Sequence, residues 1–457
     1  MNARRSAAGS IALDWLPTIA LMVVVGLGAP YLGSVARPVF IIGCFIIGWR
    51  AWAHSPELHL QAAIALFSFA PLLRRIVDYH VGFDPGGMMI AGPLVAIVAP
   101  AVELRRLALP GISVGKELLP FFVFAGCVAY CVALTLAQGE WSQAVTGALK
   151  WGAPAIYGLA LYSRRPNVPQ LLRKSAATFA VILPIIGVYG LYQYVDPPLW
   201  DRYWLALAAI TSAGFGEPYS VRTFSTMHSP ASFATFTVVG LTLVFFVGKP
   251  TLTSRILLLP SGLALLLSLY RTAWLALLAG VLFCLLFPVT RPRAVGALLL
   301  VAVAVLVAAT LTPFGEVIVE RVATLLNASQ DSSGEERMLQ YWTLWHQPDS
   351  GLIGGGFSAG DTAVAGTLPV DGMIVACWSA MGIVAGIICL ASVASVIASD
   401  IDAALSAKST EVILLGAIAC GWLVQLPLAT ITSGELGFLF WSLATLSLCM
   451  RQRAVTA

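Results

Sequence analysis

Charged residues are scarce in this chain, and their scarcity limits the class of protein before any motif is considered. Asp, Glu, Lys and Arg make up 11% of the 457 residues, whereas hydrophobic residues make up 59%. Soluble domains carry roughly 25% charged residues. The composition therefore predicts a multi-spanning membrane protein, and a net charge of +4 is too small to indicate nucleic-acid binding.

Several signals of other protein classes are also missing. The eight cysteines all lie in apolar runs and none has CxxC spacing, so neither a disulfide framework nor a zinc site is expected. Arg4 and Arg5 precede an apolar run without a small-residue cleavage pattern, so no cleavable signal peptide is expected. No Lys-Ser/Thr follows the three glycines 354–356, which excludes a phosphate-binding P-loop. Asp400 and Asp402 have DxD spacing in a predicted cytoplasmic connector, and we expect neither a metal nor a cofactor.

Apolar runs long enough to cross a hydrocarbon core of roughly 30 Å recur along the whole chain. They lie near 15–34, 38–52, 58–73, 87–102, 118–138, 142–162, 175–195, 229–248, 256–270, 272–289, 294–312, 372–397, 411–430 and 436–450. The interval 254–289 would be roughly 54 Å long as one helix, so we interpret it as a hairpin with its tip at Ser268 to Thr272. The prediction is an all-α polytopic protein with about 12–14 transmembrane helices. It forms a single membrane domain over 1–457, with one large loop over 313–371 carrying short surface helices.

The positive-inside rule predicts the orientation of these spans. Alternating the connectors from a cytoplasmic N-terminus puts most of the 26 basic residues inside, and both termini are then cytoplasmic. The cations left outside are all arginine: Arg37, Arg74, Arg75, Arg202, Arg222, Arg271, Arg321 and Arg337. Guanidinium groups suit bidentate phosphate recognition.

The polar interval 312–371 is the longest water-compatible segment, and its middle reads SSGEERMLQYWTLWHQP. Ser333 and Glu336 have the spacing of a capping box. In the helix that follows, Met338, Trp342 and Trp345 share one face, which predicts a helix lying on the membrane surface. The alternative is a plain surface loop.

Three outer segments contain candidates for chemistry. VRTFSTMHSPASFATF holds Arg222 and His228 where a connector enters a span, and its Ser and Thr residues are candidate helix caps. SLYRTAW places Arg271 at the mouth of the predicted hairpin, and the surface helix of the large loop holds Arg337. The alternatives are a helix anchor for Arg222, snorkelling to headgroups for Arg271 and a solvated face for Arg337. The alternative for His228, favoured over a catalytic role, is a residue of the membrane interface.

The order of these segments resembles the O-antigen ligase/polymerase superfamily of bacterial polysaccharide assembly. The matching stretches are RTFSTMHSPASFA, then SLYRTAW, then ERMLQYWTLWHQPDSGLIGGGFSAGD before a span with glycines near its start. The resemblance covers roughly residues 170 to 400 and rests on short motifs, their order and their spacing.

The resemblance implies an inverting membrane glycosyltransferase of GT-C-like architecture in the bacterial inner membrane. Such enzymes use undecaprenyl-diphosphate-linked oligosaccharide as donor and work on the periplasmic face. Arg222, Arg271 and Arg337 would bind the donor diphosphate, and Arg337 would also act in catalysis. Implied partners are the lipid-linked oligosaccharide, membrane lipids, a chain-length regulator and a flippase, with no nucleic acid.

The chain departs from the ligase pattern at the start of the span after the large loop. Ligases usually carry a histidine there, whereas this chain has Asp371-Gly372. The difference favours a polymerase of O-antigen or exopolysaccharide repeats over a ligase for lipid A–core or protein. Asp371 is a candidate general base, or it pairs with one of the arginines, and His228 is a second candidate base.

Further residues and one further function remain open. Arg74 and Arg75 are predicted to extend the outer cleft or to bind lipid headgroups, and Tyr341 is an accessory cleft residue that stacks on a sugar or anchors at the interface. The alternative outside the enzyme class is a transporter or flippase of lipid-linked sugar. No clear repeat of the kind that transporters contain relates the two halves of the sequence.

Overall fold

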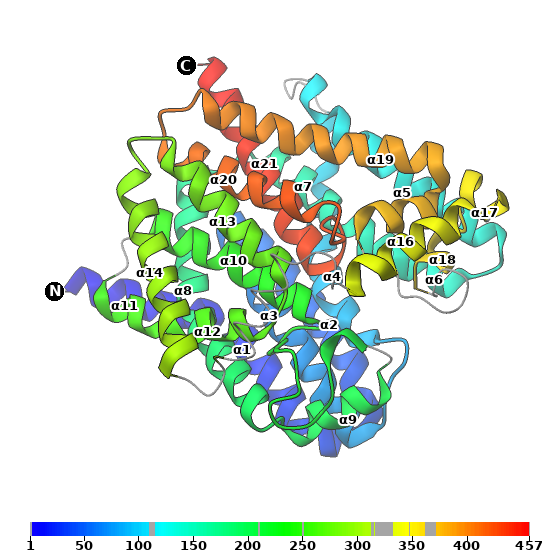
Figure 1. Ribbon diagram of the computed structural model, residues 1–457, viewed down its shortest axis with the longest axis horizontal. Coiled ribbons are helices and arrows are strands. Elements are labelled where there is room, and N and C mark those ends of the chain that lie inside the picture. The colour runs from blue at the N-terminus through cyan, green and yellow to red at the C-terminus, as the bar shows by residue number, and fades with distance from the viewer. Residues whose placement is uncertain are drawn as a thin grey trace. The chain divides into compact units, whose positions relative to one another are not determined.

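The computed structural model describes residues 2–108, 115–208, 211–248, 251–311, 315, 332–346, 348–361 and 372–456. Within these residues the fold is all-α, and the one β-type contact is an isolated bridge between Gly214 and Val221. Figure 1 shows the helices coloured along the chain.

The chain divides into two compact units. Unit 1 comprises Met1–Val102 and Pro169–Ser268, and unit 2 comprises Glu103–Val168 and Leu269–Ala457. The helices of unit 1 are α1 (Asn2–Leu32), α2 (Ala36–His54), α3 (Pro56–Val81), α4 (Ala91–Val98), α8 (Val168–Val195, beginning at the boundary), α9 (Leu199–Leu207), α10 (Pro230–Val247), α11 (Leu252–Leu257) and α12 (Leu259–Leu267). The helices of unit 2 are α5 (Leu119–Ala137), α6 (Trp141–Gly147), α7 (Ala153–Arg164), α13 (Arg271–Leu285), α14 (Arg291–Leu311), α16 (Ser332–Trp345), α17 (Pro348–Ile353), α18 (Gly356–Asp361), α19 (Met373–Leu405), α20 (Thr410–Gln425) and α21 (Gly434–Thr456).

The predicted apolar runs fall on these helices, and the chain is a multi-pass membrane protein. Among the described residues, seven helical segments are long and apolar enough to cross a bilayer, and α13 and α20 are shorter apolar helices. The predicted break in the run 254–289 is also present, because α12 ends at Leu267 and α13 begins at Arg271. The further spans, up to the 12–14 expected, stay a prediction.

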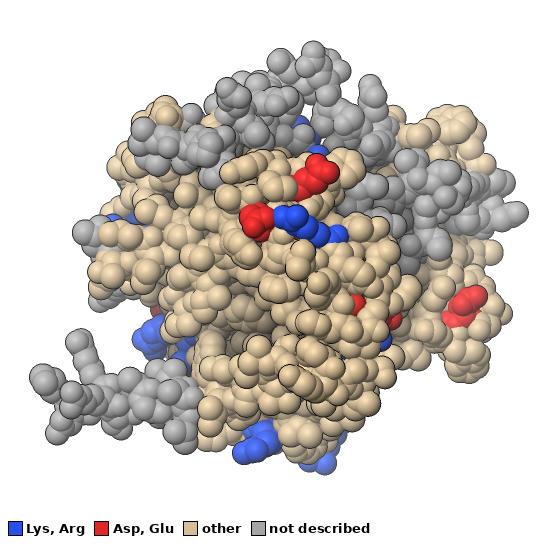
Figure 2. All heavy atoms as spheres, turned by 90° about the horizontal axis from the view of Figure 1, so that it is seen from below, with Lys and Arg blue, Asp and Glu red and all other residues tan. Residues whose placement is uncertain are grey.

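The surface agrees with this class of protein. Figure 2 shows one face on which Lys, Arg, Asp and Glu side chains are few among the other residues. Many large apolar side chains on the helices are exposed, among them Leu27, Ile42 and Leu299. Exposed apolar side chains of this kind face lipid in a membrane protein.

Unit 1 is packed through close helix contacts. The side chains of α1, α2 and α3 share one buried cluster with Met89 and Ala96. A Cβ added at Gly48 of α2 would lie 2.5 Å from the Ala96 carbonyl oxygen, so glycine allows α2 and α4 to touch. Glycine serves α8 and α12 in the same way, because a Cβ at Gly187 would lie 2.4 Å from the Ser261 nitrogen. Small residues at helix interfaces are the usual means of packing in membranes.

Unit 2 follows the same rule along α13, α19 and α20. A Cβ at Gly280 of α13 would lie 2.9 Å from the Ala417 oxygen, and one at Gly416 of α20 would lie 2.2 Å from the Ala404 Cβ. Aromatic rings join α21 to two neighbouring helices. The ring centroid of Trp441 lies 4.7 Å from those of Phe121 and Phe124 of α5, and that of Phe438 lies 5.6 Å from Tyr157 of α7.

The structure corrects the span predicted over 372–397. Gly382 has non-helical backbone angles (φ 74°, ψ 175°) that divide α19 into residues 373–381 and 383–405. Cys377 and Cys389 have their sulfur atoms 3.9 Å apart, although twelve residues of straight helix span roughly 18 Å. Residues 373–381, the folded-back segment, therefore turn back along α19. A continuous helix of 33 residues would be roughly 50 Å long, well beyond the bilayer.

Candidate functional site

In unit 1 the predicted residues Arg222 and His228 lie on the connector between α8 and α10, over residues 196–229. Gln193, near the end of α8, organises this connector from inside. Its Oε1 accepts hydrogen bonds from the backbone nitrogens of Phe224 (3.1 Å) and Ser225 (2.7 Å). Its Nε2 donates to Asp201 Oδ2 of α9 at 2.6 Å. One buried amide thus fixes both ends of the connector.

Arg75 of α3 binds the same connector from the other side. Its Nε lies 2.6 Å from Asp201 Oδ1, and its two terminal nitrogens donate to the carbonyl oxygens of Met227 and Ser225, each at 2.5 Å. The guanidinium also lies over the Phe224 ring, 4.8 Å from the centroid. Arg75 is 1% exposed, so all of these contacts are made inside the protein.

Backbone contacts complete the attachment of the connector to neighbouring helices. The Leu72 nitrogen of α3 donates to the Thr226 oxygen, and the Thr223 nitrogen donates to the Leu267 oxygen of α12, both at 3.1 Å. Leu267 precedes Arg271 by four residues in the chain. Ser225 has φ 52°, and its hydroxyl donates to the Ile186 oxygen of α8 at 2.5 Å.

The two predicted residues on this connector are partly exposed. The Arg222 nitrogen donates to the Ala213 oxygen at 3.0 Å, beside the Gly214–Val221 bridge. The His228 ring stands edge-on to Trp204, with centroids 5.5 Å apart. Of the predicted capping residues, Ser229 caps α10, because its Oγ accepts from the Ser232 nitrogen at 3.2 Å.

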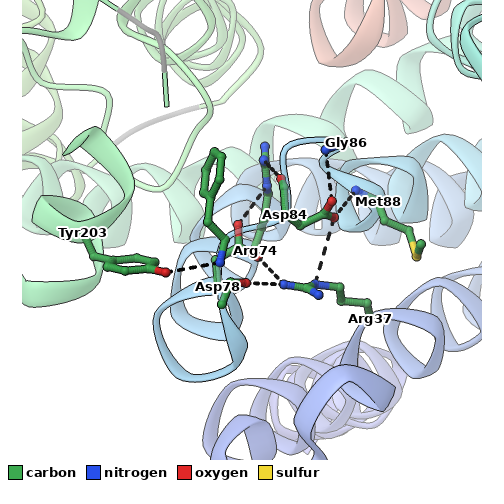
Figure 3. A network of polar contacts seen from close by, with 9 residues as sticks. Arg37, Arg74, Asp78, Asp84, Gly86, Met88 and Tyr203 are labelled. Atoms are coloured by element: carbon green, nitrogen blue, oxygen red, sulfur yellow. Dashed lines mark hydrogen bonds and ion pairs between the residues drawn. The ribbon is translucent and has the colours of Figure 1, made fainter. Parts of the chain in front are cut away.

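A charged network surrounds the C-terminal part of α3 (Figure 3). Asp78 lies 3.0 Å from Arg37 Nη2 and 3.3 Å from Arg74 Nε. Arg74 also donates to the Asp84 carbonyl oxygen at 2.6 Å, and the Asp84 carboxylate accepts from the nitrogens of Gly86 and Met88. Three arginines and three aspartates, with Arg75 and Asp201 included, give this region a balanced charge.

Arg74 and Arg75 were predicted to extend a cleft or to bind lipid headgroups, and the structure shows how exposed their side chains are. Both side chains are buried, and each is paired with a carboxylate. Direct contact between either residue and a ligand stays a prediction. The contacts in the structure are with the protein itself, and through them these residues hold the loops that follow α3 and precede α10.

In unit 2, residues next to Asp371 and Arg271 and the helix that contains Arg337 lie near the folded-back segment. Its first turn lies against the connector between α20 and α21, because a Cβ at Gly372 (φ 90°) would be 2.4 Å from the Pro427 oxygen. The Tyr270 hydroxyl donates to the Leu428 oxygen at 3.3 Å. The residue after Asp371 and the residue before Arg271 therefore meet at Pro427 and Leu428. Asp371 itself lies outside the described residues.

The stretch predicted to form a surface helix is helical, as α16, and it packs on the folded-back segment. Its place on the membrane surface stays a prediction. Leu344 is buried against Val375, and Tyr341 and Trp378 lie beside this pair. The Trp378 Nε1 also donates to the Gly351 oxygen of α17 at 3.1 Å. Arg337 lies in the first half of α16, and its side chain is outside the described residues. Figure 1 shows α16, α17 and α18 beside α19.

The three glycines 354–356 close the break in α19. The Gly355 nitrogen donates to the Ser379 oxygen at 2.8 Å, which satisfies a carbonyl at the end of the folded-back segment. The Tyr130 hydroxyl of α5 donates to the Ile353 oxygen at 2.7 Å. The Phe357 nitrogen donates to Thr135 Oγ1 of α5 at 2.8 Å. This turn therefore has an architectural task in joining α5 to α19.

The remaining acidic candidates do not form a cluster of ligands. Asp400 Oδ1 lies 3.4 Å from Arg451 Nη2 of α21. Over the part of the chain that the structure describes, no three His, Cys, Asp or Glu residues are grouped to hold a metal ion.

The sequence did not single out Gln193, Asp201 or Trp378. A signal was available for Gln193, because an amide within an apolar helix needs an internal partner. No local signal marks Asp201, since its partner Arg75 lies 126 residues earlier in the chain and the pairing depends on how α3 and α9 pack. A scan against protein-family models and a search of curated proteins give no match to this chain.

Proposed function

We propose that this protein is an inner-membrane glycosyltransferase that polymerises undecaprenyl-diphosphate-linked saccharide repeats on the periplasmic face, with a GT-C-like arrangement of helices. The observation that carries the proposal is that sequence-distant motifs of unit 2 lie next to two adjoining elements, the folded-back segment and the connector between α20 and α21. Tyr270, next to Arg271, and Gly372, next to Asp371, both contact residues 427–428. The helix that contains Arg337 packs on the same segment through Leu344 and Val375.

The chemistry of this reaction calls for residues of these types. The acceptor hydroxyl attacks the anomeric carbon of the donor sugar, the bond from that carbon to the phosphate oxygen breaks, and the configuration inverts. The leaving undecaprenyl diphosphate takes the electron pair, and the proton of the attacking hydroxyl passes to a general base. Arg222, Arg271 and Arg337 would stabilise the charge that builds on the diphosphate, and Asp371 or His228 would take the proton.

A polymerase is preferred to a ligase on the identity of the residue before the folded-back segment. Asp371 stands where the ligase pattern has histidine. A carboxylate there is suited to a base that works beside cationic side chains, because the opposite charges hold it ionised. The acceptor would then be a second lipid-linked repeat, with lipid A–core or protein as the ligase alternative.

A second candidate function is transport of the lipid-linked sugar. The break at Gly382 favours it, because discontinuous helices often form substrate sites in transporters. The carbonyl of Ser379 at this break is bonded to the Gly355 nitrogen, so that group is already engaged by the protein.

A cellular complementation assay on polysaccharide chain length tests the proposal. The variants are Arg222→Lys, Arg271→Lys, Arg337→Lys and Asp371→Asn, with Arg255→Lys, an exposed residue of α11, as the control. Lysine keeps the charge but loses the bidentate geometry of guanidinium. A polymerase predicts single-repeat product at the cell surface for the four variants and long polymer for the control.

The other outcomes are distinct. Loss of all surface saccharide, with lipid-linked repeat retained on the cytoplasmic face, would indicate a flippase. Normal polymer from all four variants would contradict the proposed site.

A further inference from the structure

Arg75 is a buried side chain of unit 1 whose guanidinium makes an ion pair and two hydrogen bonds. Its Nε pairs with Asp201 of α9, and its terminal nitrogens donate to two carbonyl oxygens of the connector, those of Ser225 and Met227. The rings of Phe224 and Trp204 lie over its guanidinium, at 4.8 and 5.9 Å. A single side chain of α3 therefore contacts two parts of the connector at once, α9 and residues 224–227.

Burying this arginine with its aspartate costs free energy, which indicates that the pair has a specific structural role. Taking an arginine and an aspartate out of water is unfavourable, and an apolar pair of similar volume often gives equal or greater stability. The hydrogen bonds to Ser225 and Met227 fix main-chain atoms, which an apolar pair cannot do. What this arrangement provides is therefore a defined position for residues 224–227 of the connector.

The fixed residues lie between Arg222 and His228. Gln193 holds the nitrogens of Phe224 and Ser225 from α8, while Arg75 holds the oxygens of Ser225 and Met227 from α3. Ser225 has φ 52°, a conformation that a residue other than glycine rarely adopts without support. These bonds restrict the main chain between residues 222 and 228.

We infer that Arg75, with Asp201 and Gln193, is a positioning residue that holds the connector so that Arg222 and His228 meet the donor diphosphate and the reacting hydroxyl. This inference rests on the proposed glycosyl transfer. Arg75 touches no reacting atom in this scheme and acts through the main chain of residues 224–227. Misplacing a reacting group by about 1 Å is enough to lower a rate by about 100-fold.

The test uses the full-length protein in lipid nanodiscs and two kinds of measurement. The first is hydrogen–deuterium exchange of peptides covering 219–229, read by mass spectrometry, which needs no enzymatic activity. The second is the steady-state rate of polymerisation with an undecaprenyl-diphosphate-linked repeat as the substrate. The variants are Arg75→Gln, Arg75→Lys, and the double change Arg75→Met with Asp201→Leu.

The double change separates positioning from folding. It removes both buried charges together, so no unpaired charge remains and the fold is expected to persist, but the bonds to Ser225 and Met227 are lost. The matched control is Arg164→Gln, which removes the arginine of an ion pair with Glu103 in unit 2.

We expect Arg75→Gln and the double change to speed exchange in 219–229 by about 10-fold or more, because charge-assisted hydrogen bonds to that segment are lost. Exchange in peptides of α5 stays unchanged.

The kcat falls by about 100-fold, whereas the KM for the donor changes by less than about threefold, since the donor contacts themselves are retained. Arg75→Lys restores part of the kcat, because one ammonium can keep the pair with Asp201 but cannot reach both carbonyl oxygens. Arg164→Gln leaves both measurements as in the wild type.

Two results overturn the inference. Unchanged exchange in 219–229 for a folded double variant would show that Arg75 does not hold the connector, whatever the enzyme does. Faster exchange with an unchanged kcat would show that the position of the connector does not matter for turnover. If the wild type forms no polymer at all, the proposed function fails, and the exchange measurement still decides whether Arg75 holds the connector.

Discussion

Gly382 determines the path of α19 by its backbone conformation alone. Its φ of 74° lies in the region that favours glycine. A Cβ at this position would lie 2.2 Å from the Leu352 oxygen of α17, closer than any real contact. Both the conformation and the space therefore require glycine at the point where the folded-back segment turns.

Replacing Gly382 by alanine is expected to destabilise the protein by more than about 2 kcal/mol, because strain and a clash with backbone add up. Gly296→Ala in α14 is the control, since nothing lies within 4 Å of an added Cβ there. Alanine in a helix interior is favourable by about 0.5–1 kcal/mol relative to glycine. Thermal unfolding in detergent measures both variants, and equal unfolding temperatures would contradict the account of Gly382.

Residue-level predictions from the sequence succeed where a residue acts locally. Ser229 was a predicted cap and is one, because capping depends on the next three residues. The pairing of Arg75 with Asp201 was not predicted, because it depends on how α3 and α9 pack. The side-chain positions of Arg337 and Asp371 lie outside the described residues.

At the scale of elements, α16 has one face buried against α19 and another face exposed. Leu344 is 2% exposed and packs on Val375, whereas Met338 is 70% exposed. Trp342 and Trp345 are exposed as well, on the face that the sequence predicted to be apolar. Such a face suits the membrane interface, and contact with lipid stays a prediction.

Truncating the two faces of α16 should have different effects on stability. Leu344→Ala removes buried contacts with α19 and is expected to cost about 2–3 kcal/mol, the lower part of the range for buried leucine. Met338→Ala changes an exposed side chain and is expected to stay within about 0.5 kcal/mol of the wild type. The unfolding temperatures of the two variants in detergent check this difference, and a larger loss for Met338→Ala would reverse the assignment of the faces.

The fold-back of α19 brings two cysteines close together, and this can be tested by disulfide formation. Cys377 and Cys389 have sulfur atoms 3.9 Å apart, whereas a straight helix would separate them by roughly 18 Å, too far for a disulfide. Oxidation of the detergent-solubilised protein with copper phenanthroline should therefore give a linked 377–389 peptide in mass spectrometry. The Cys377→Ala variant is the control that must lack this peptide.

Cys127 also contacts Cys389 and can compete for it. If complete oxidation of a Cys127→Ala variant links neither Cys377 nor Cys389 to the other, the fold-back of α19 is wrong. The sequence does not reveal this turn, because Gly382 lies in an unbroken apolar run and glycines are common in such runs. Helix length was the available signal. For 254–289 this length predicts two helices, and α12 and α13 are separate.

At the scale of the whole molecule, the chain is a multi-pass membrane protein whose orientation rests on its charges. Arginine and lysine concentrate in connectors that alternate with apolar runs, which predicts that both termini are cytoplasmic. Composition and run length were sufficient for the fold class, because the bilayer allows few architectures.

The orientation predicts the behaviour of C-terminal fusions expressed in a bacterium. A green fluorescent protein fused after Ala457 should fluoresce, and alkaline phosphatase at the same point should be inactive, because the phosphatase folds only outside the cytoplasm. Alkaline phosphatase inserted in the large loop near residue 330 should be active. The reverse pattern would place the predicted site on the cytoplasmic face, whereas the proposed donor saccharide lies on the periplasmic face.

The most direct test of the proposed function is an assay of the purified protein in nanodiscs with an undecaprenyl-diphosphate-linked repeat as the substrate and no other protein. The measured quantities are the length of the saccharide and the amount of released undecaprenyl diphosphate. A polymerase predicts a ladder of products with one diphosphate released per new glycosidic bond, greatly reduced in Arg271→Lys and retained in Arg255→Lys. Intact substrate and no released diphosphate from the wild-type protein would contradict the proposed glycosyl transfer.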